Sequence, residues 1–334
     1  MSAELVRVEG LSKRFDLSPS WLSRMVSGSP AQVLRAVDEV SFSIPRGTTL
    51  ALVGESGCGK STIARLLVGL QTPSAGRVLF DGADVHQTLR ERRAPAQRLR
   101  QRVQMIFQDP YASLDPRWTV ADIVAEPLLE QGLASPGAEA QGRVAELLAA
   151  VGLAGADGAR FPHQFSGGQR QRISIARALA TAPDFLVCDE PTSALDVSVQ
   201  AQVLNLMRDL QRARGLTYLF ISHNLAVVRY VSDSVGVLYL GRLVEWAPRA
   251  RLFKQPRHPY TRMLLDAIPK LNDPGRSRNP VQGEVPNPLA PPSGCAFHPR
   301  CPHAKERCRQ ERPQLLDKDG ARVACHAVEE GRLP

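Results

Sequence analysis

Short apolar runs alternate with longer amphipathic stretches along the first 265 residues. Residues 5–8 and 40–44 alternate apolar and polar side chains, which is typical of half-buried strands. Residues 50–53 are continuously apolar and stop at a glycine, as expected of a strand that is buried on both faces. Four further apolar runs predict strands, at residues 103–107, 185–188, 218–221 and 235–239.

Helical periodicity separates these strands. From Lys60 to Leu70, apolar residues recur three and four positions apart, which predicts a helix directly after a glycine-rich turn. Residues 199–214 show the same spacing. Strands that alternate with helices predict an α/β fold with helices on the faces of the sheet. Residues from about 109 to 182 lack strong strand patterns and predict a helical subdomain.

The composition changes near residue 265. Prolines, arginines and cysteines dominate from there to the C-terminus, and apolar periodicity fades. We therefore predict two domains, at residues 1–265 and 266–334. The second domain is too short and too polar to form a large core, so we expect it to need a stabilising link such as a bound metal. Residues 16–35 are rich in Ser and Pro and predict an inserted loop.

The overall composition is that of a globular protein with a basic surface. Of the 334 residues, 43% are hydrophobic and 22% are charged. Lysine and arginine exceed the acidic residues by 42 to 33, and the pI is near 9.6. This excess favours an anionic partner, such as nucleotide phosphates, nucleic acid or a membrane surface. No membrane-spanning run or signal peptide is evident, so we expect a soluble, cytosolic chain that needs partner subunits for any membrane role.

Residues 54–62, GESGCGKST, fit the phosphate-binding pattern G-x-x-x-x-G-K-[ST]. Its glycines let backbone N–H groups turn toward phosphates, and the following helix N-terminus adds partial positive charge. We expect Lys60 to neutralise the β and γ phosphates of ATP and Ser61 to offer its hydroxyl to Mg²⁺. A glycine turn without a ligand is the alternative, which the strand–turn–helix context argues against. The expected nucleotide contacts are Gly54, Glu55, Ser56, Gly57, Cys58, Gly59, Lys60, Ser61 and Thr62.

Two acids follow the apolar run at 185–188. In the segment FLVCDEP, Asp189 would hold Mg²⁺ through its water shell, and Glu190 would polarise the attacking water as general base. Such a base contributes about 10²–10⁴-fold in rate. Alone, the pair would indicate exposed acids at a strand end. Beside a phosphate-binding loop, it supplies the two groups that phosphoryl transfer needs.

Residues 165–172, FSGGQRQR, resemble the signature sequence of ABC ATPases. Ser166, Gly167 and Gly168, followed by Gln169, would cap a helix whose N-terminus faces an anion. In that family, the anion is the γ phosphate on the opposing subunit, so two subunits enclose each ATP. The resemblance implies a P-loop NTPase fold, with a RecA-like core, an antiparallel β part and a helical subdomain.

Other positions match the ABC pattern, and the resemblance implies their roles. Gln108, within MIFQDP, matches the glutamine that contacts Mg²⁺ and the attacking water and senses the membrane partner. His223 matches the histidine that hydrogen-bonds the γ phosphate, and with Glu190 these residues form the expected catalytic set. Asp196 ends the segment SALD, which matches the loop that crosses the dimer interface.

The adenine contact is less specific. Phe15 would stack on adenine as the family's N-terminal aromatic does, or would be a core residue at a strand edge. Trp21 is a less favoured candidate for the adenine contact. Two departures from the family pattern, Phe165 for leucine and Asn224 for aspartate, do not touch the phosphate chemistry directly.

The C-terminal region indicates which branch of the ABC ATPases the chain resembles. Residues 257–271 and 283–308 resemble the corresponding region of dipeptide, oligopeptide and nickel importer ATPases, most of all the second ATPase subunit of a dipeptide permease. The resemblance implies ATP hydrolysis that powers peptide uptake on the cytoplasmic face of a bacterial inner membrane. The implied partners are a related ATPase in a heterodimer, two transmembrane permease subunits and a periplasmic peptide-binding protein. Nickel, glutathione and antimicrobial peptides stay open as ligands, because other subunits choose the ligand.

Four of the six cysteines lie in the last forty residues: Cys295, Cys301, Cys308 and Cys325. In a cytosolic protein, such a cluster indicates metal binding or redox chemistry. Their spacing differs from the close pairs of most structural zinc sites. Relatives carry a [4Fe–4S] cluster in this region, so the resemblance implies an iron–sulfur cluster with a structural role. Zinc, with His298, His303 or His326 as substitute ligands, and free thiols are the alternatives.

Two other functions are possible for an ABC ATPase. A soluble ABC ATPase acting on nucleic acid or ribosomes fits the basic pI, but such relatives usually have tandem modules, coiled coils or zinc inserts, so we expect no nucleic-acid partner. A regulatory subunit without hydrolysis is disfavoured because Glu190 and His223 are intact.

Six arginines between residues 90 and 102 predict a solvated helix face, or a contact with lipid headgroups or a permease loop.

Overall fold

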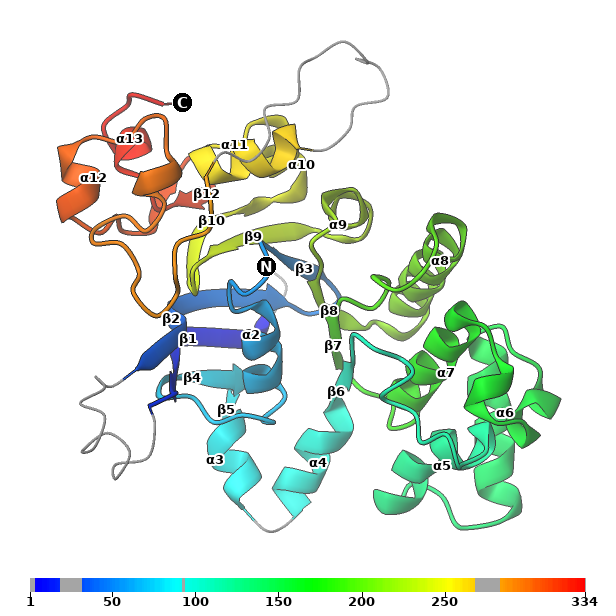
Figure 1. The fold of residues 1–334 in the computed structure, drawn as a ribbon. Coiled ribbons are helices and arrows are strands. Elements are labelled where there is room, and N and C mark those ends of the chain that lie inside the picture. The colour runs from blue at the N-terminus through cyan, green and yellow to red at the C-terminus, as the bar shows by residue number, and fades with distance from the viewer. Residues whose placement is uncertain (1–3, 19–31, 92–93, 268–282, 334) are drawn as a thin grey trace.

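A computed structural model describes residues 4–18, 32–91, 94–267 and 283–333. An eight-stranded sheet forms the centre of the molecule (Figure 1). Its strands are, in spatial order, β11 (Leu316–Lys318), β12 (Ala321–Val323), β10 (Arg242–Pro248), β9 (Ser234–Tyr239), β3 (Thr49–Val53), β8 (Thr217–Ile221), β7 (Phe185–Asp189) and β6 (Val103–Ile106).

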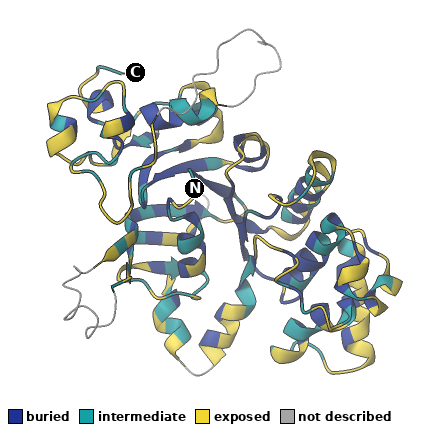
Figure 2. Cartoon of the chain, in the orientation of Figure 1, coloured by how far each residue is buried: buried dark blue, intermediate teal, exposed yellow. Residues whose placement is uncertain are grey.

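The five strands from β9 to β6 are parallel, and the other neighbours in this sheet are antiparallel. Every residue of β3, β7 and β8 is buried (Figure 2). Helices on both faces of a parallel sheet exclude water from it, which explains why these strands are continuously apolar in the sequence. The five strands predicted from apolar runs are therefore confirmed.

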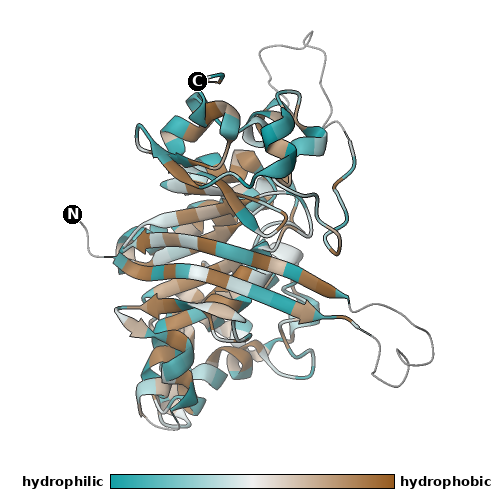
Figure 3. Ribbon diagram, turned by 90° about the vertical axis from the view of Figure 1, so that its left-hand side faces the viewer, coloured by the Kyte–Doolittle hydropathy of each residue, from teal (hydrophilic) through white to brown (hydrophobic). Residues whose placement is uncertain are grey.

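A second, antiparallel sheet has the order β2 (Val33–Pro45), β1 (Glu4–Asp16), β4 (Ala75–Phe80) and β5 (Ala83–Asp84). Strands β1 and β2 form the long ribbon that crosses the view in Figure 3. Both extend well beyond the short segments predicted from alternation. The predicted loop at 16–35 is correspondingly shorter, since β2 already begins at Val33, and residues 19–31 lie outside the described part of the chain.

Helices cover the sheets and form a separate lobe. The helices next to the sheets are α2 (Lys60–Leu67), α3 (Val85–Arg90), α4 (Ala94–Arg102), α8 (Val197–Arg214) and α9 (Leu225–Val231). The lobe consists of α5 (Val120–Glu130), α6 (Ala138–Ala150) and α7 (Gly167–Leu179), with the short 3₁₀ turns η1 (Gly155–Ala159) and η2 (Pro162–Gln164) between them (Figure 1). Residues 109–182 are all described and contain no strand.

The C-terminal part adds α10 (Arg249–Lys254), α11 (Pro259–Asp266), η3 (His298–Arg300), α12 (Glu306–Gln310) and α13 (His326–Glu329). Its strand β12 pairs with β10, at Glu245 opposite Val323, so the region extends the central sheet. Phe297 and Val323 lie in one apolar cluster with Tyr239 of β9. This region therefore shares the core of the main sheet.

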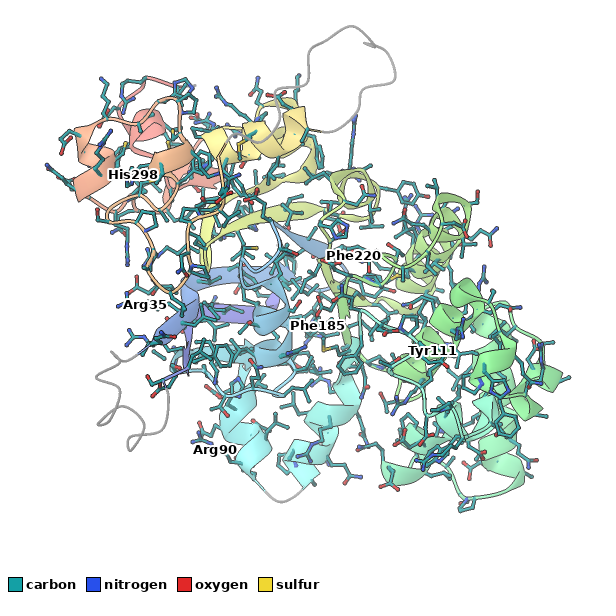
Figure 4. The ribbon with its side chains drawn as sticks, in the orientation of Figure 1. Arg35, Arg90, Tyr111, Phe185, Phe220 and His298 are labelled. Carbon is teal, nitrogen blue, oxygen red and sulfur yellow. The ribbon has the colours of Figure 1, made fainter. Side chains whose placement is uncertain are left out.

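The basic stretch before β6 is partly engaged in ion pairs. Arg102 bonds Asp184 at 2.5 Å and Asp81 at 2.8 Å, which ties the end of α4 to both sheets. Arg90 lies exposed at the end of α3 (Figure 4). Arg92 and Arg93 lie outside the described residues. Among the helices that the structure describes, none has both the length and the apolar character needed to cross a membrane.

Candidate active site

The phosphate-binding loop, residues 54–62, connects β3 to α2. It runs so close to other backbone that only glycine fits at two positions. A Cβ on Gly59, whose φ is 103°, would lie 2.2 Å from the carbonyl oxygen of Ala36. A Cβ on Gly54, whose φ is 152°, would lie 2.3 Å from that of Leu238. The glycines therefore serve both the left-handed turn and the close approach to β2 and β9.

Lys60 reaches back across this loop. Its Nζ donates to the carbonyl oxygens of Gly54 at 2.8 Å and Glu55 at 3.0 Å, and the residue is only 5% exposed. The ammonium is therefore held inside the curve of the loop, where a phosphate group would lie. Phosphate oxygens are stronger acceptors for an ammonium than neutral carbonyls, because their hydrogen bonds are charge-assisted.

The two expected Mg²⁺ ligands are neighbours. Asp189 ends β7, is 3% exposed, and accepts a hydrogen bond from the Ser61 hydroxyl at 3.0 Å. Burial raises the pKa of Asp189, and the charge of Glu190 raises it further, whereas the Ser61 hydrogen bond and the charges of Arg65 and Lys60 oppose the shift. A hydroxyl and a carboxylate oxygen are the ligand types that Mg²⁺ prefers.

Glu190 stands at the centre of the three expected catalytic side chains. Its Oε2 lies 3.3 Å from Nε2 of Gln108 and 3.0 Å from Nδ1 of His223. Its backbone is left-handed, with φ 47°, and its N–H donates to the carbonyl oxygen of Ile221 at 3.0 Å. The three residues follow β6, β7 and β8, whose carboxyl ends lie side by side. The structure thus brings together residues separated by 82 and 33 positions.

A cavity of about 960 Å³ lies above these groups, lined by the phosphate-binding loop, Gln108, Glu190 and His223. Phe15 also lines it, which favours the adenine contact over a place in the core. Trp21 lies outside the described residues. Several further lining residues belong to no sequence motif and could not be predicted, because they come from β2, from the turn between β9 and β10, and from the C-terminal part. They are Leu34, Arg35, Ala36, Leu240, Gly241 and Pro288, and Figure 4 labels Arg35 on β2.

The signature residues begin α7. Ser166 caps this helix reciprocally: the Gln169 N–H donates to the Ser166 hydroxyl at 3.3 Å, and the Ser166 N–H donates to the Gln169 side-chain oxygen at 3.0 Å. A Cβ on Gly168 would lie 2.2 Å from a methyl of Val199, so α7 starts tightly against α8. None of Ser166, Gly167, Gly168 and Gln169 is among the described residues that line the cavity.

Asp196 likewise lies away from this cavity. It caps α8, because its Oδ1 accepts a hydrogen bond from the Val199 N–H at 3.0 Å. The neighbouring Ser193 and Ala194 do line the cavity, next to Glu190. The loop at 193–196 therefore runs from the region of Glu190 to α8, against which the start of α7 packs.

The four-cysteine region, residues 295–325, lies beyond β10. The Cys295 N–H donates to the Cys308 carbonyl at 2.8 Å. Burial raises the pKa of Cys295 to about 12 and of Cys301 to about 11, and the charges of Cys325 and Cys308 add to both shifts. Nevertheless, among the residues with described positions, no group of three or more His, Cys, Asp or Glu side chains could hold a metal ion. The predictions of an iron–sulfur cluster and of zinc are therefore not supported by the ligand geometry.

Taken together, a buried parallel sheet, a phosphate-binding loop after β3, two acids at the end of β7 and a capped helix define a P-loop ATPase. Residues 37–193 match the family model described as ABC transporter. Residues 244–308 match the model described as oligopeptide/dipeptide transporter, C-terminal region. The second match spans the predicted boundary at residue 265.

Full-length relatives agree with these matches. The chain is 50% identical to a probable peptide ABC transporter ATP-binding protein, y4tS of Sinorhizobium fredii, over 98% of this chain and 90% of the relative. It is 52% identical to the di/tripeptide transport ATP-binding protein DppF of Pseudomonas aeruginosa, over 92% of this chain and 94% of the relative. The chain therefore belongs to the ATP-binding subunits of ABC transporters, and it is an ATPase.

Solved structures show the same fold. CbiO1 of Clostridium perfringens, part of the ABC transporter complex cbiONQ, has a TM-score of 0.62 at 26% identity, over 75% of this chain and 91% of that one. The dimeric ATP-binding cassette MJ0796, bound to ADP and Pi, has a TM-score of 0.61 at 25% identity, over 73% of this chain and 98% of that one.

Proposed function

We propose that this chain hydrolyses ATP to drive peptide import through a membrane permease. The observation that carries the proposal is the position of Glu190, held between Gln108 and His223 at the edge of the cavity that the phosphate-binding loop lines. Peptide as cargo is supported by the names of the relatives and by the C-terminal family match.

Each residue of the site has a defined task in this proposal. The loop amides and Lys60 bind the β and γ phosphates. Ser61, Asp189 and Gln108 would hold Mg²⁺, which would neutralise charge on the phosphate oxygens. Glu190 orients the attacking water and accepts its proton. His223, whose Nδ1 contacts the same carboxylate oxygen, offers its other ring nitrogen to the γ phosphate.

A second subunit completes the site. The start of α7 presents Ser166 at its exposed end, and this helix N-terminus does not line the chain's own cavity. A helix N-terminus favours an anion, so this end suits the γ phosphate bound by a facing subunit. We infer a heterodimer with a related ATPase, in which Asp196 lies at the interface. ATP closes the two subunits, and hydrolysis lets them open.

The remaining partners follow from the cargo. Two transmembrane permease subunits would carry the peptide, and a periplasmic peptide-binding protein would deliver it. The chain would lie on the cytoplasmic face of the inner membrane. Within it, we propose a nucleotide-binding domain at residues 1–265, with the helical subdomain at about 109–182, and a C-terminal domain at 266–334.

Reconstitution tests this function. The chain is co-expressed with candidate permease, partner ATPase and peptide-binding subunits from the same organism, and the complex is placed in liposomes with a labelled dipeptide outside. Uptake that requires internal ATP and is lost in Glu190→Gln supports the proposal. Uptake of nickel or glutathione but no peptide would reassign the cargo, and a complex without ATP-dependent uptake of any of these would refute transport.

For the four-cysteine region, we propose a [4Fe–4S] cluster held by Cys295, Cys301, Cys308 and Cys325. Tetrahedral zinc with Zn–S near 2.3 Å needs sulfurs about 3.8 Å apart. A cube places irons and sulfides between its ligands and thus tolerates thiols that are farther apart. The Cys295 N–H donates to the Cys308 carbonyl, and Cys295, Cys301 and Cys325 pack against one apolar cluster, which supports their proximity. Anaerobically purified chain should be brown, with about four irons. Colourless protein with one zinc, or with no metal, would refute the cluster.

A further inference from the structure

Glu55, the second residue of the phosphate-binding loop, is held by two residues from far along the chain. Its backbone N–H donates to the Tyr260 hydroxyl at 2.9 Å. Its carboxylate accepts two hydrogen bonds from Arg300, at 2.7 and 2.9 Å. Its carbonyl accepts the bond from Lys60. The amide, carbonyl and side chain of one loop residue are thus all fixed, and neither Tyr260 nor Arg300 is among the described residues that line the nucleotide cavity.

Arg300 is not a surface partner. Its side chain is 2% exposed, whereas that of Glu55 is 23% exposed. Its Nη1 also lies 3.4 Å from the Tyr239 hydroxyl, and the guanidinium lies over the rings of Tyr239 and Phe297. A forked, two-bond contact fixes the orientation of a carboxylate as well as its position. Arg300 therefore determines how Glu55 sits in the loop.

Arg300 belongs to the four-cysteine region. It is the last residue of η3 and is followed directly by Cys301, whose N–H donates to the His298 carbonyl at 3.3 Å. Figure 4 shows His298 among the C-terminal elements, beside the central sheet. Phe297 packs edge-on against Tyr239, with ring centroids 5.3 Å apart. The position of the guanidinium is therefore set by the way in which the cysteine-bearing segments fold against β9.

We propose that Arg300 is a positioning residue for the phosphate-binding loop, through which the fold of the four-cysteine region sets the affinity of the chain for Mg·ATP. This inference rests on the proposed function. When Arg300 holds Glu55, the loop is ordered before ATP arrives, and binding costs less conformational entropy. When the region loosens, Glu55 is released and Mg·ATP binds more weakly, although Glu190 and its chemistry stay intact.

Calorimetric titration of Mg·ATP into the full chain tests this. The variants are Arg300→Met, Glu55→Gln and the two combined. Each single change should raise Kd about tenfold or more, and the combination should do no worse than the stronger single change, because both remove one contact. For Arg300→Met, the rate at saturating Mg·ATP should change by less than about twofold, since the hydrolytic groups are untouched.

Arg322→Met is the matched control. This arginine lies on β12, with its guanidinium 4.8 Å from the Trp246 ring, and it does not contact the loop. Its Kd should equal that of the wild type. Arg300→Lys keeps the charge but loses the fork, so its Kd should lie between those of the wild type and Arg300→Met.

Circular dichroism and thermal unfolding identify any variant that misfolds. If Arg300→Met does not fold, Arg300→Lys, which keeps the charge but loses the forked contact with Glu55, must still raise Kd. An unchanged Kd in the folded variants, or fully additive effects in the combined one, overturns the positioning role. A wild-type chain that binds no Mg·ATP overturns the proposed function itself, which is a distinguishable result.

Discussion

Replacing Glu190 by glutamine removes one charge and changes almost nothing else. The side chain is 14% exposed and contacts Gln108 and His223 through Oε2 alone. A glutamine at this position has the same shape and can turn its oxygen or its amide toward either neighbour. The left-handed backbone, held by the bond to the Ile221 carbonyl, is unaffected because that bond uses the main chain.

The expected loss can be worked out from this geometry. A general base contributes about 10²–10⁴-fold, which corresponds to ~2.7–5.5 kcal/mol of barrier at 1.36 kcal/mol per tenfold. Binding of Mg·ATP should not weaken, because removing a carboxylate beside the γ phosphate removes a repulsion. The variant should therefore bind ATP, close with its partner and remain closed.

Two assays separate binding from turnover. Steady-state release of phosphate from the reconstituted complex gives the rate, and size-exclusion chromatography with Mg·ATP shows the closed ATPase pair. Glu146→Gln, an exposed acid on α6, is the matched control and should turn over like the wild type. Wild-type turnover by Glu190→Gln would show that another group is the base, and loss of Mg·ATP binding would show that this carboxylate holds the nucleotide.

Three further predictions concern the phosphate-binding loop and Asp189, the expected Mg²⁺ ligand. Lys60→Ala should weaken Mg·ATP binding by about 10²-fold or more, because each ionic hydrogen bond contributes ~1.5–3 kcal/mol; unchanged affinity in calorimetry would remove its assignment. Mg·ATP affinity should fall when the pH is lowered and Asp189 becomes protonated, and this fall should occur at a higher pH than for an ordinary Asp, because burial raises the pKa of Asp189. The raised pKa also means that the contribution of Asp189 to the stability of the apo chain falls as the pH rises through that window. An Asp189→Asn variant that keeps the wild-type pH dependence of affinity and of stability would contradict both statements. Gly59→Ala should lower the free energy of unfolding by about 1–3 kcal/mol, because its Cβ would meet the Ala36 carbonyl at a φ of 103°; Gly142→Ala, which meets nothing within 4 Å, should instead raise it by ~0.5–1 kcal/mol in thermal melts.

Local chemistry explains what the sequence predicted. The phosphate-binding loop, the Asp189–Glu190 pair and the capping box at Ser166 each need residues within one short segment, so their spacing is visible without coordinates. The departures from the family pattern also have local reasons. Asn224 caps α9 by accepting from the Ala226 N–H at 3.0 Å, and Phe165 is buried under the guanidinium of Arg160.

Contacts between distant segments that belong to no motif could not be predicted. Strand β12 is only three residues long and forms by pairing with β10. It is too short to show the alternation of apolar and polar residues that predicts a strand. The bond between Glu55 and Arg300 joins residues 245 positions apart. Arg35 and Pro288 reach the nucleotide cavity because β2 and the C-terminal part fold beside it. Burial of the cysteines likewise depends on the sheet against which they pack.

The most direct measurement is the heat of Mg·ATP binding, titrated into the assembled transporter complex and into the same complex carrying Lys60→Ala. Saturable binding that the lysine change abolishes in this subunit is the expected result. Complexes that show identical heats, or no heat at all, would mean that no triphosphate occupies the loop between β3 and α2.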